Sequence, residues 1–239
     1  MRYLTKTTVV ALGGLSFLFP ATGANAQQSK GGVAQAPAAT VAAPVYKPPL
    51  LGAPGGRVGG GTRSAGREFV LSVLAPDHSG LTLREHPSLY WYISDKTSLP
   101  VELTVIDPRA TRPVLETRLP SPTAAGIHRI RLADHRVRLD PEITYQWFIA
   151  VIPDTGRRSR DILAGGTIVR ITAPEALKNK LAETPPAEAP HIYAEAGVWY
   201  DALAALSELI EGAPNDAALR RQRGALVSQV GLSGLGEDR

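Results

Sequence analysis

Seven short runs rich in β-branched and aromatic residues limit the folds open to this chain more than any other feature. They are separated by Pro, Gly and Asp, and several alternate apolar with polar residues, as Ile127 to Leu132 do. The runs lie at 69–75, 88–94, 101–107, 114–119, 126–132, 144–151 and 166–171. Short strands at this spacing, with no helical period between them, predict an antiparallel β-sandwich and disfavour a doubly wound sheet.

One local signature refines this prediction. The stretch LDPEITYQW, residues 139–147, places Leu, Pro and Tyr as L-x-P-x-x-x-Y at the entry to the sixth run. This spacing resembles the fibronectin type III pattern, in which the tyrosine hydroxyl bonds back to upstream backbone. We therefore expect an immunoglobulin/fibronectin type III-like sandwich, with Tyr145 structural and Trp147 in the core. The alternative is that these aromatics line a sugar-binding face.

Helical signals begin after the last run. Thr172 and Glu175 form a predicted capping box, and Pro185 and Pro186 end that first helix. From residue 197 onward, one helical stripe carries Trp199, Leu203, Leu206 and Ile210. Gly212 and Pro214 end this helix, and Asn215 or Asp216 caps a last one. On that last helix the sequence predicts Arg220, Arg221 and Arg223 exposed, with Leu219, Leu226 and Val230 inward.

This helical segment has a repeat-like pattern. Its matching residues are Gly197, Trp199, Ala202, Leu203, Leu206 and Pro214. They fit the second helix of a tetratricopeptide (TPR) repeat in kind and spacing. The prediction is one degenerate TPR-like repeat within residues 173–239, too short to form a solenoid groove alone. Glu195 and Asp201 are expected to cap helices and remain solvated.

The N-terminus predicts export. Residues 1–26 combine basic Arg2 and Lys6, a short apolar run at 7–19, and the small-x-small sequence Ala24-Asn25-Ala26. This is the layout of a signal peptide cleaved after Ala26. The apolar run is shorter than the roughly 20 residues of a spanning helix, so a retained anchor is the weaker alternative. We expect a periplasmic or secreted protein with no transmembrane segment after cleavage.

Residues 27–67 are predicted to be a flexible basic linker rich in Ala, Pro and Gly. The linker holds five basic residues and no acidic one, and the signal peptide holds two more of the chain's 26. Residues 68–239 therefore carry 19 basic and all 22 acidic residues, a net charge of −3. We expect no nucleic-acid partner, and we expect two folded parts, a sandwich at 68–172 and the helices at 173–239.

No cofactor, metal or catalytic set is predicted. The Gly-rich stretch GRVGGGTR lacks the Lys-Ser/Thr order of a phosphate loop, and Ser159 has no G-x-S-x-G context. Asp77-His78 and Glu85-His86 could flank a metal, but solvated loops are the favoured interpretation. The chain has no cysteine and hence no disulfide.

The candidate contact site is the tip of the last hairpin. It gathers Arg157, Arg158, Arg160 and Asp161. The cluster is either a solvated loop or a contact for an anion or partner protein, since arginine is favoured at interfaces.

Several segments of the chain, taken in order, resemble the sequences of a known protein family. They are GGRVGGGTR, GLTLREHPSLYWYI, LPSPTAAGIHRIRL, YQWFIAV, RRSRDILAGGTIVR and IYAEAGVWYDALAALSEL, spread over residues 57–232. Together they are similar to the domain of unknown function 928 (DUF928) family, exported proteins found mostly in cyanobacteria. Members often carry one or two cysteines, which this chain lacks. The resemblance implies export but no activity.

Three functions stay open from the sequence. The favoured one is a non-enzymatic cell-envelope adaptor that binds another envelope or secreted protein through the arginine tip, the last helix, or both. The second is a carbohydrate- or peptidoglycan-binding module with an aromatic platform drawn from Tyr90, Trp91, Tyr92 or Trp147. The third is a hydrolase, for which no nucleophile–base pair is visible.

Overall fold

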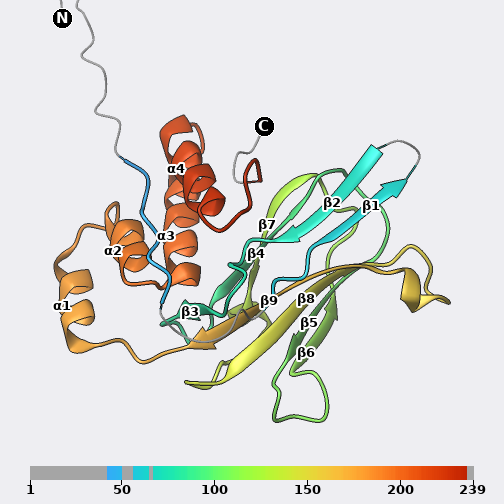
Figure 1. Cartoon of the computed structure of the whole chain (residues 1–239), viewed down its shortest axis with the longest axis horizontal. Coiled ribbons are helices and arrows are strands. Elements are labelled where there is room, and N and C mark those ends of the chain that lie inside the picture. Colours follow the sequence, from blue (N-terminus) through green and yellow to red (C-terminus); the bar gives the residue numbers. More distant parts are fainter. Residues whose placement is uncertain (1–41, 50–55, 65–66, 236–239) are drawn as a thin grey trace, which may run out of the picture. The chain divides into compact units, whose positions relative to one another are not determined.

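The computed structural model of the chain describes residues 42–49, 56–64 and 67–235. The predicted signal peptide and residues 27–41 of the predicted linker lie outside these ranges. Within them, the expectation of mainly β structure followed by C-terminal helices is confirmed (Figure 1).

The strands form two sheets. The first has the order β1-β2-β4-β7, with antiparallel pairing throughout, and the second has the order β3-β9-β8-β5-β6. Their bounds are β1 Gly60–Ser64, β2 Arg67–Val73, β3 Gly80–Thr82, β4 Ser88–Ile93, β5 Val101–Ile106, β6 Leu115–Arg118, β7 Gly126–Arg131, β8 Thr144–Val151 and β9 Ile162–Arg170. All seven predicted runs are strands. The second sheet departs from the predicted antiparallel pattern, because β3 pairs with β9 in parallel.

Alternation along the strands builds the core. Leu71, Trp91 and Leu103 are buried members of one hydrophobic cluster that also holds Trp147 and Ile149 from β8. Because successive side chains of a strand point to opposite faces, each of these strands turns every second residue inward. Trp147 therefore lies in the core, as expected.

Tyr145 makes the hydrogen bond expected from its spacing. Its buried hydroxyl accepts the backbone N–H of Asp140 at 3.1 Å. Asp140 belongs to the loop that leads into β8, so the bond fixes the entry of that strand.

Four α-helices follow the sheets, α1 Glu175–Glu183, α2 Ala189–Glu195, α3 Trp199–Gly212 and α4 Ala217–Ser228. Gly197 joins α2 to α3 with φ of +74°, a conformation that glycine adopts without a Cβ penalty. The N–H of Val198 bonds to the Tyr193 carbonyl and that of Gly197 to the Ala194 carbonyl, the two bonds of a Schellman motif. This turn brings α3 back against α2.

Two predicted caps have different outcomes. Asp216 caps α4, because its side chain accepts the N–H groups of Ala218 and Leu219. The predicted capping box of α1 is wrong: Pro174 is the N-cap residue and no side chain caps the helix. Thr172 lies two residues before that position, too early to reach the first turn.

The helices and the sheets share one core, which corrects the expected division at residue 172. The indole N–H of Trp199 bonds to the Leu74 carbonyl at 2.9 Å. The Tyr200 hydroxyl donates to the Thr167 carbonyl and accepts the Trp147 indole N–H, both at 2.9 Å. The first turn of α3 is therefore bonded to both sheets, and the described residues between 42 and 235 fold around a continuous cluster.

Part of the predicted linker belongs to the fold. Residues 60–64 form β1 beside β2, and Tyr46 is buried in the hydrophobic cluster. The glycines of 60–64 predict no strand, yet pairing with β2 supplies the backbone bonds that a strand needs. The expectation of a flexible linker is thus wrong for these two pieces.

Two side chains expected in solvent are buried. Asp201 is 1% exposed, because it turns from the first turn of α3 toward β3. Arg223 is 5% exposed and has polar partners. It follows Leu219 by four residues and precedes Leu226 by three, so it shares their inward face.

Candidate functional site

The arginine tip lies between β8 and β9, where Arg158–Arg160 form a short 3₁₀ turn, η2. Arg158 is held in place by two carboxylates. It bonds to Glu102 on β5 at 2.8 Å and to Asp161 at 2.7 Å. The hydrogen bond from Arg158 lowers the pKa of Glu102, and the bond to Glu102 raises the pKa of Arg158. Arg158 and Asp161 therefore anchor the turn to the sheet.

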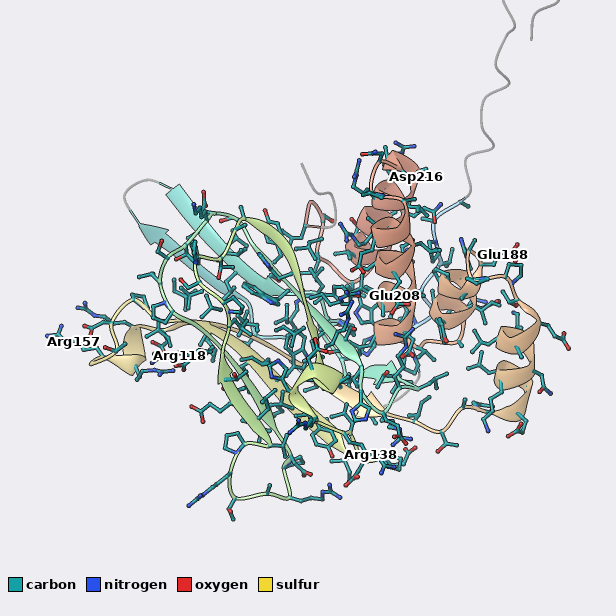
Figure 2. The ribbon with its side chains drawn as sticks, turned by 180° about the vertical axis from the view of Figure 1, so that it is seen from behind. Arg118, Arg138, Arg157, Glu188, Glu208 and Asp216 are labelled. Atoms are coloured by element: carbon teal, nitrogen blue, oxygen red, sulfur yellow. The ribbon has the colours of Figure 1, made fainter. Side chains whose placement is uncertain are left out.

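Arg157 and Arg160 are the outward donors of this tip. Both are exposed, and the nearest carboxylate oxygen to Arg157, on Asp154, is 3.9 Å away. Within the described ranges no ion-pair partner is found for Arg160. Figure 2 shows Arg157 and Arg118 at the end of the sheets away from Glu188 and Asp216 on the helical side. The site thus combines Arg158, which two carboxylates hold, with two exposed arginines, of which Arg157 has only a long ion pair to Asp154.

Three loops meet at this end, and we call them the tip loops: 94–100, 119–125 and 152–161. Thr97 and Thr123 exchange two backbone hydrogen bonds of 2.9 and 2.8 Å. The N–H of Ile152 bonds to the Pro100 carbonyl at 2.9 Å. These bonds join the three loops into one surface supported by both sheets.

A cavity of about 370 Å³ opens beside the tip loops, between residues 119–124 and β7. Trp91 and His128 line it, with their rings stacked at a centroid distance of 4.6 Å. The His128 ring also bonds to the Ala124 carbonyl at 2.8 Å, and the buried Trp91 N–H has no hydrogen-bond partner among the described residues. The sequence pattern did not predict this cavity. Its walls come from β4, β7 and residues 119–124, which lie apart in the sequence and meet only in the folded chain.

Three of the four residues predicted for an aromatic platform are too buried to form one. Tyr90, Trp91 and Trp147 are each at most 2% exposed, and Tyr92 is half-buried. A flat sugar-stacking surface needs exposed rings. Burial raises the pKa of the Tyr90 hydroxyl, which has no hydrogen-bond partner among the described residues.

Asp201, a carboxylate that the sequence analysis expected in solvent, is buried and joins the helices to the sheet. Asp201 accepts the N–H of Leu83 at 3.1 Å and pairs with Arg84 at 3.3 Å. Arg84 in turn bonds to Glu208, two turns further along the same face of α3. Burial raises the pKa of Asp201 above its ordinary value. Because all these partners belong to the chain itself, the cluster is a joint between α3 and the residues after β3.

No metal-binding cluster is found in the described part of the chain. There, no group of three or more His, Asp or Glu side chains could hold a metal ion. The ring nitrogens of His78 and His86 bond to backbone carbonyls, of Ser79 and Val137 respectively. Ser159 lies exposed in η2. Among the same residues, no helix is both long and apolar enough to cross a membrane.

The fold and the site define a class: a protein of two β-sheets whose helical segment is rooted in the same core and whose loops form a cationic tip. Its family follows from the sequence comparison. A family model described as Domain of Unknown Function (DUF928) matches residues 58–238, and the chain belongs to this family. The resemblance seen in the sequence is thereby confirmed. No curated protein matches the chain.

Proposed function

We propose that this protein is a non-enzymatic binding module, exported to the cell envelope, that holds another envelope or secreted protein at its tip loops. Export rests on the signal-peptide pattern of residues 1–26. The binding role rests on the tip itself, since loops on a rigid scaffold are the usual place for recognition.

An immunoglobulin/fibronectin type III-like sandwich is the architecture we propose for the sheets. The order β2-β4-β7 follows the A-B-E strands of that fold, and β9-β8-β5 follows the G-F-C strands. Tyr145, near the start of β8, occupies the place of the tyrosine corner in strand F. On this assignment residues 152–161 are the F–G loop, a frequent recognition loop of such domains.

For the helices we propose one degenerate TPR-like unit. The Gly197 turn between α2 and α3, and the small-and-large apolar stripe of α3, support it. A single unit cannot close a core of its own, which agrees with Trp199 and Tyr200 lying in the sandwich.

One observation carries the binding proposal: Arg158 is fixed by Glu102 and Asp161 while Arg157 and Arg160 face outward. Fixing the turn in the free protein removes much of the entropy that binding would otherwise cost. Two guanidinium forks are then presented from one anchored turn, which suits carboxylates of an acidic protein surface. The partner we expect is an acidic face of another protein.

The test replaces both outward donors. In Arg157→Glu/Arg160→Glu the binding charge is reversed, while the Arg158 anchor is kept. The matched control is Arg112→Glu/Arg136→Glu, two exposed arginines in loops at the other end of the strands. Each variant carries a photo-crosslinking residue in place of Thr155. It is expressed with its predicted signal peptide in a bacterium that itself encodes a protein of this family.

Crosslinked envelope proteins are then identified by mass spectrometry. We expect one dominant adduct in the wild type and the control, and at least a ten-fold loss in the tip variant at an unchanged melting temperature. Equal adducts in both variants, or crosslinks to polysaccharide alone, would reject the proposal.

A further inference from the structure

Residues 42–49, AAPVYKPP, lie against the helices as an extended strap outside both sheets. Three backbone contacts hold them. The Lys47 N–H bonds to the Ala194 carbonyl at 3.0 Å. The Gln229 side chain accepts the Tyr46 N–H at 2.9 Å and donates to the Pro44 carbonyl at 2.8 Å. Figure 1 shows this strap, in blue, beside α2 and α3. The side-chain amide of Gln229 thus hydrogen-bonds to two backbone groups of the extended strap.

One side chain of the strap enters the protein. The Tyr46 ring is 6% exposed, whereas Val45 beside it is 64% exposed. Tyr46 meets the edge of Trp199 at a centroid distance of 5.0 Å and lies parallel to His78 at 5.9 Å. Its hydroxyl is 3.3 Å from Nε2 of His78. These two rings form a slot that selects an aromatic residue with a hydroxyl.

The groove floor is shaped for close approach of a backbone. A Cβ added to Gly197 would lie 2.8 Å from the Lys47 carbonyl oxygen and 3.3 Å from Cδ of Pro49. At the rim, Lys47 pairs with Glu195 at 3.0 Å. Glycine therefore lets the strap lie directly on the α2–α3 turn, and the carboxylate favours a basic residue after the tyrosine.

The strap itself has the features of a peptide ligand. Prolines at 44, 48 and 49 restrict its backbone to extended conformations, so little entropy is lost when it is held. Backbone hydrogen bonds combined with one side-chain slot are how many peptide-binding grooves recognise their ligands. The groove residues His78, Ala194, Trp199 and Gln229 lie inside the family match at 58–238, whereas the strap precedes it.

We propose that the groove formed by the α2–α3 turn, Trp199, His78 and Gln229 is a peptide-recognition site. In this chain it is filled in cis by the strap, residues 42–49. It takes in trans an extended peptide of another polypeptide with the pattern Pro-x-Tyr-Lys-Pro, which replaces the strap. The site is separate from the tip loops, so the two proposals stand or fall independently.

The first experiment empties the slot in the full-length chain with Tyr46→Ala. A fluorescent peptide of sequence AAPVYKPP is titrated, and its anisotropy is followed. We expect saturable binding to the variant and at least ten-fold weaker binding to the wild type, where the tethered strap competes at high effective concentration. Val45→Ala, which changes an exposed residue of the same strap, is the control and should behave like the wild type.

Two further changes distinguish specific recognition of the peptide from non-specific binding. A peptide with alanine in place of tyrosine should bind the Tyr46→Ala chain at least ten-fold more weakly. Gln229→Ala, combined with Tyr46→Ala, should weaken the unchanged peptide about five-fold or more, because the two-point backbone clamp is lost. Equal binding of both peptides, or equal binding to wild type and variant, would overturn the proposal.

A second experiment covers the case in which Tyr46→Ala does not fold. A protease site inserted between Leu51 and Gly52 is cut in the folded chain, which turns the strap into a peptide held only by the groove. Excess AAPVYKPP should then displace the cut strap, whereas the alanine peptide should not. A cut strap that no peptide displaces, or one that leaves and is not replaced, would overturn the proposal.

Discussion

Tyr200→Phe removes the hydroxyl that links α3 to the β-sheet while keeping the ring. In the wild type that hydroxyl accepts the Trp147 N–H and donates to the Thr167 carbonyl, both at 2.9 Å. Trp147 is fully buried and Thr167 nearly so. Phenylalanine therefore leaves one donor and one acceptor in the core without partners, and it creates no cavity.

The magnitude follows from those two orphaned groups. A buried polar group left without its partner costs about 1–3 kcal/mol. Two of them, offset in part by the more apolar ring, lower the free energy of unfolding by about 2–4 kcal/mol. For a chain of this size each 1 kcal/mol moves the melting temperature by about 2–4 °C, so a fall of roughly 5–15 °C is expected.

The assay is urea denaturation followed by tryptophan fluorescence and far-UV circular dichroism in parallel. Tyr92→Phe is the matched control, since Tyr92 is only half-buried on β4, and it should change the free energy of unfolding by less than about 0.5 kcal/mol. If Tyr200→Phe is as stable as this control, the Trp147–Tyr200–Thr167 hydrogen bonds do not join α3 to the sheets.

Three other substitutions probe separate parts of the fold. Tyr145→Phe should lower the free energy of unfolding by about 1 kcal/mol or more, because the Asp140 N–H loses its acceptor; an unchanged thermal midpoint would argue that this hydrogen bond does not stabilise the fold. Asp107 has its pKa lowered to about 2, chiefly by the hydrogen bonds from Arg109, so its contribution is present above its ordinary value of 3.8 and is lost as the pH falls toward 2. Asp107→Asn should therefore be less stable than the wild type above pH 4 and equal to it near pH 2, and parallel stability curves would contradict this. Gly197→Ala should cost at least about 1–2 kcal/mol, because of its positive φ and because the added Cβ would lie 2.8 Å from the Lys47 carbonyl oxygen; an equal effect of Gly212→Ala, where a Cβ meets nothing within 4 Å, would refute both causes.

Much of the β structure follows from local pattern. The run at 144–151 is a strand with the predicted bounds, since its alternation and aromatic content leave little choice of register. β1 could not be predicted in this way, because the sequence GGTRS has few strand-forming residues and depends on its partner β2. The last strand begins at Ile162 rather than 166, since Gly165 and Gly166 are held in the ladder by β8.

The position of the arginines in the fold was predictable, but their contacts were not. The sequence located the arginines at a hairpin tip, yet it could not show that Arg158 is neutralised by Glu102, 56 residues away along the chain. Asp201 illustrates the same limit: its partners Leu83 and Arg84 lie more than one hundred positions earlier. Contacts of this kind depend on tertiary structure, which periodicity does not encode.

Amide hydrogen exchange of the wild-type chain, followed by mass spectrometry, tests most directly the claim that helices and sheets form one frame for both proposed binding sites. If α3 shares one core with the sheets, peptides covering α3 and β8 open with free energies within about 1 kcal/mol of each other. Tyr200→Phe should lower both by the same amount. Exchange of α3 at a much lower free energy, with β8 still fully protected, would contradict the account.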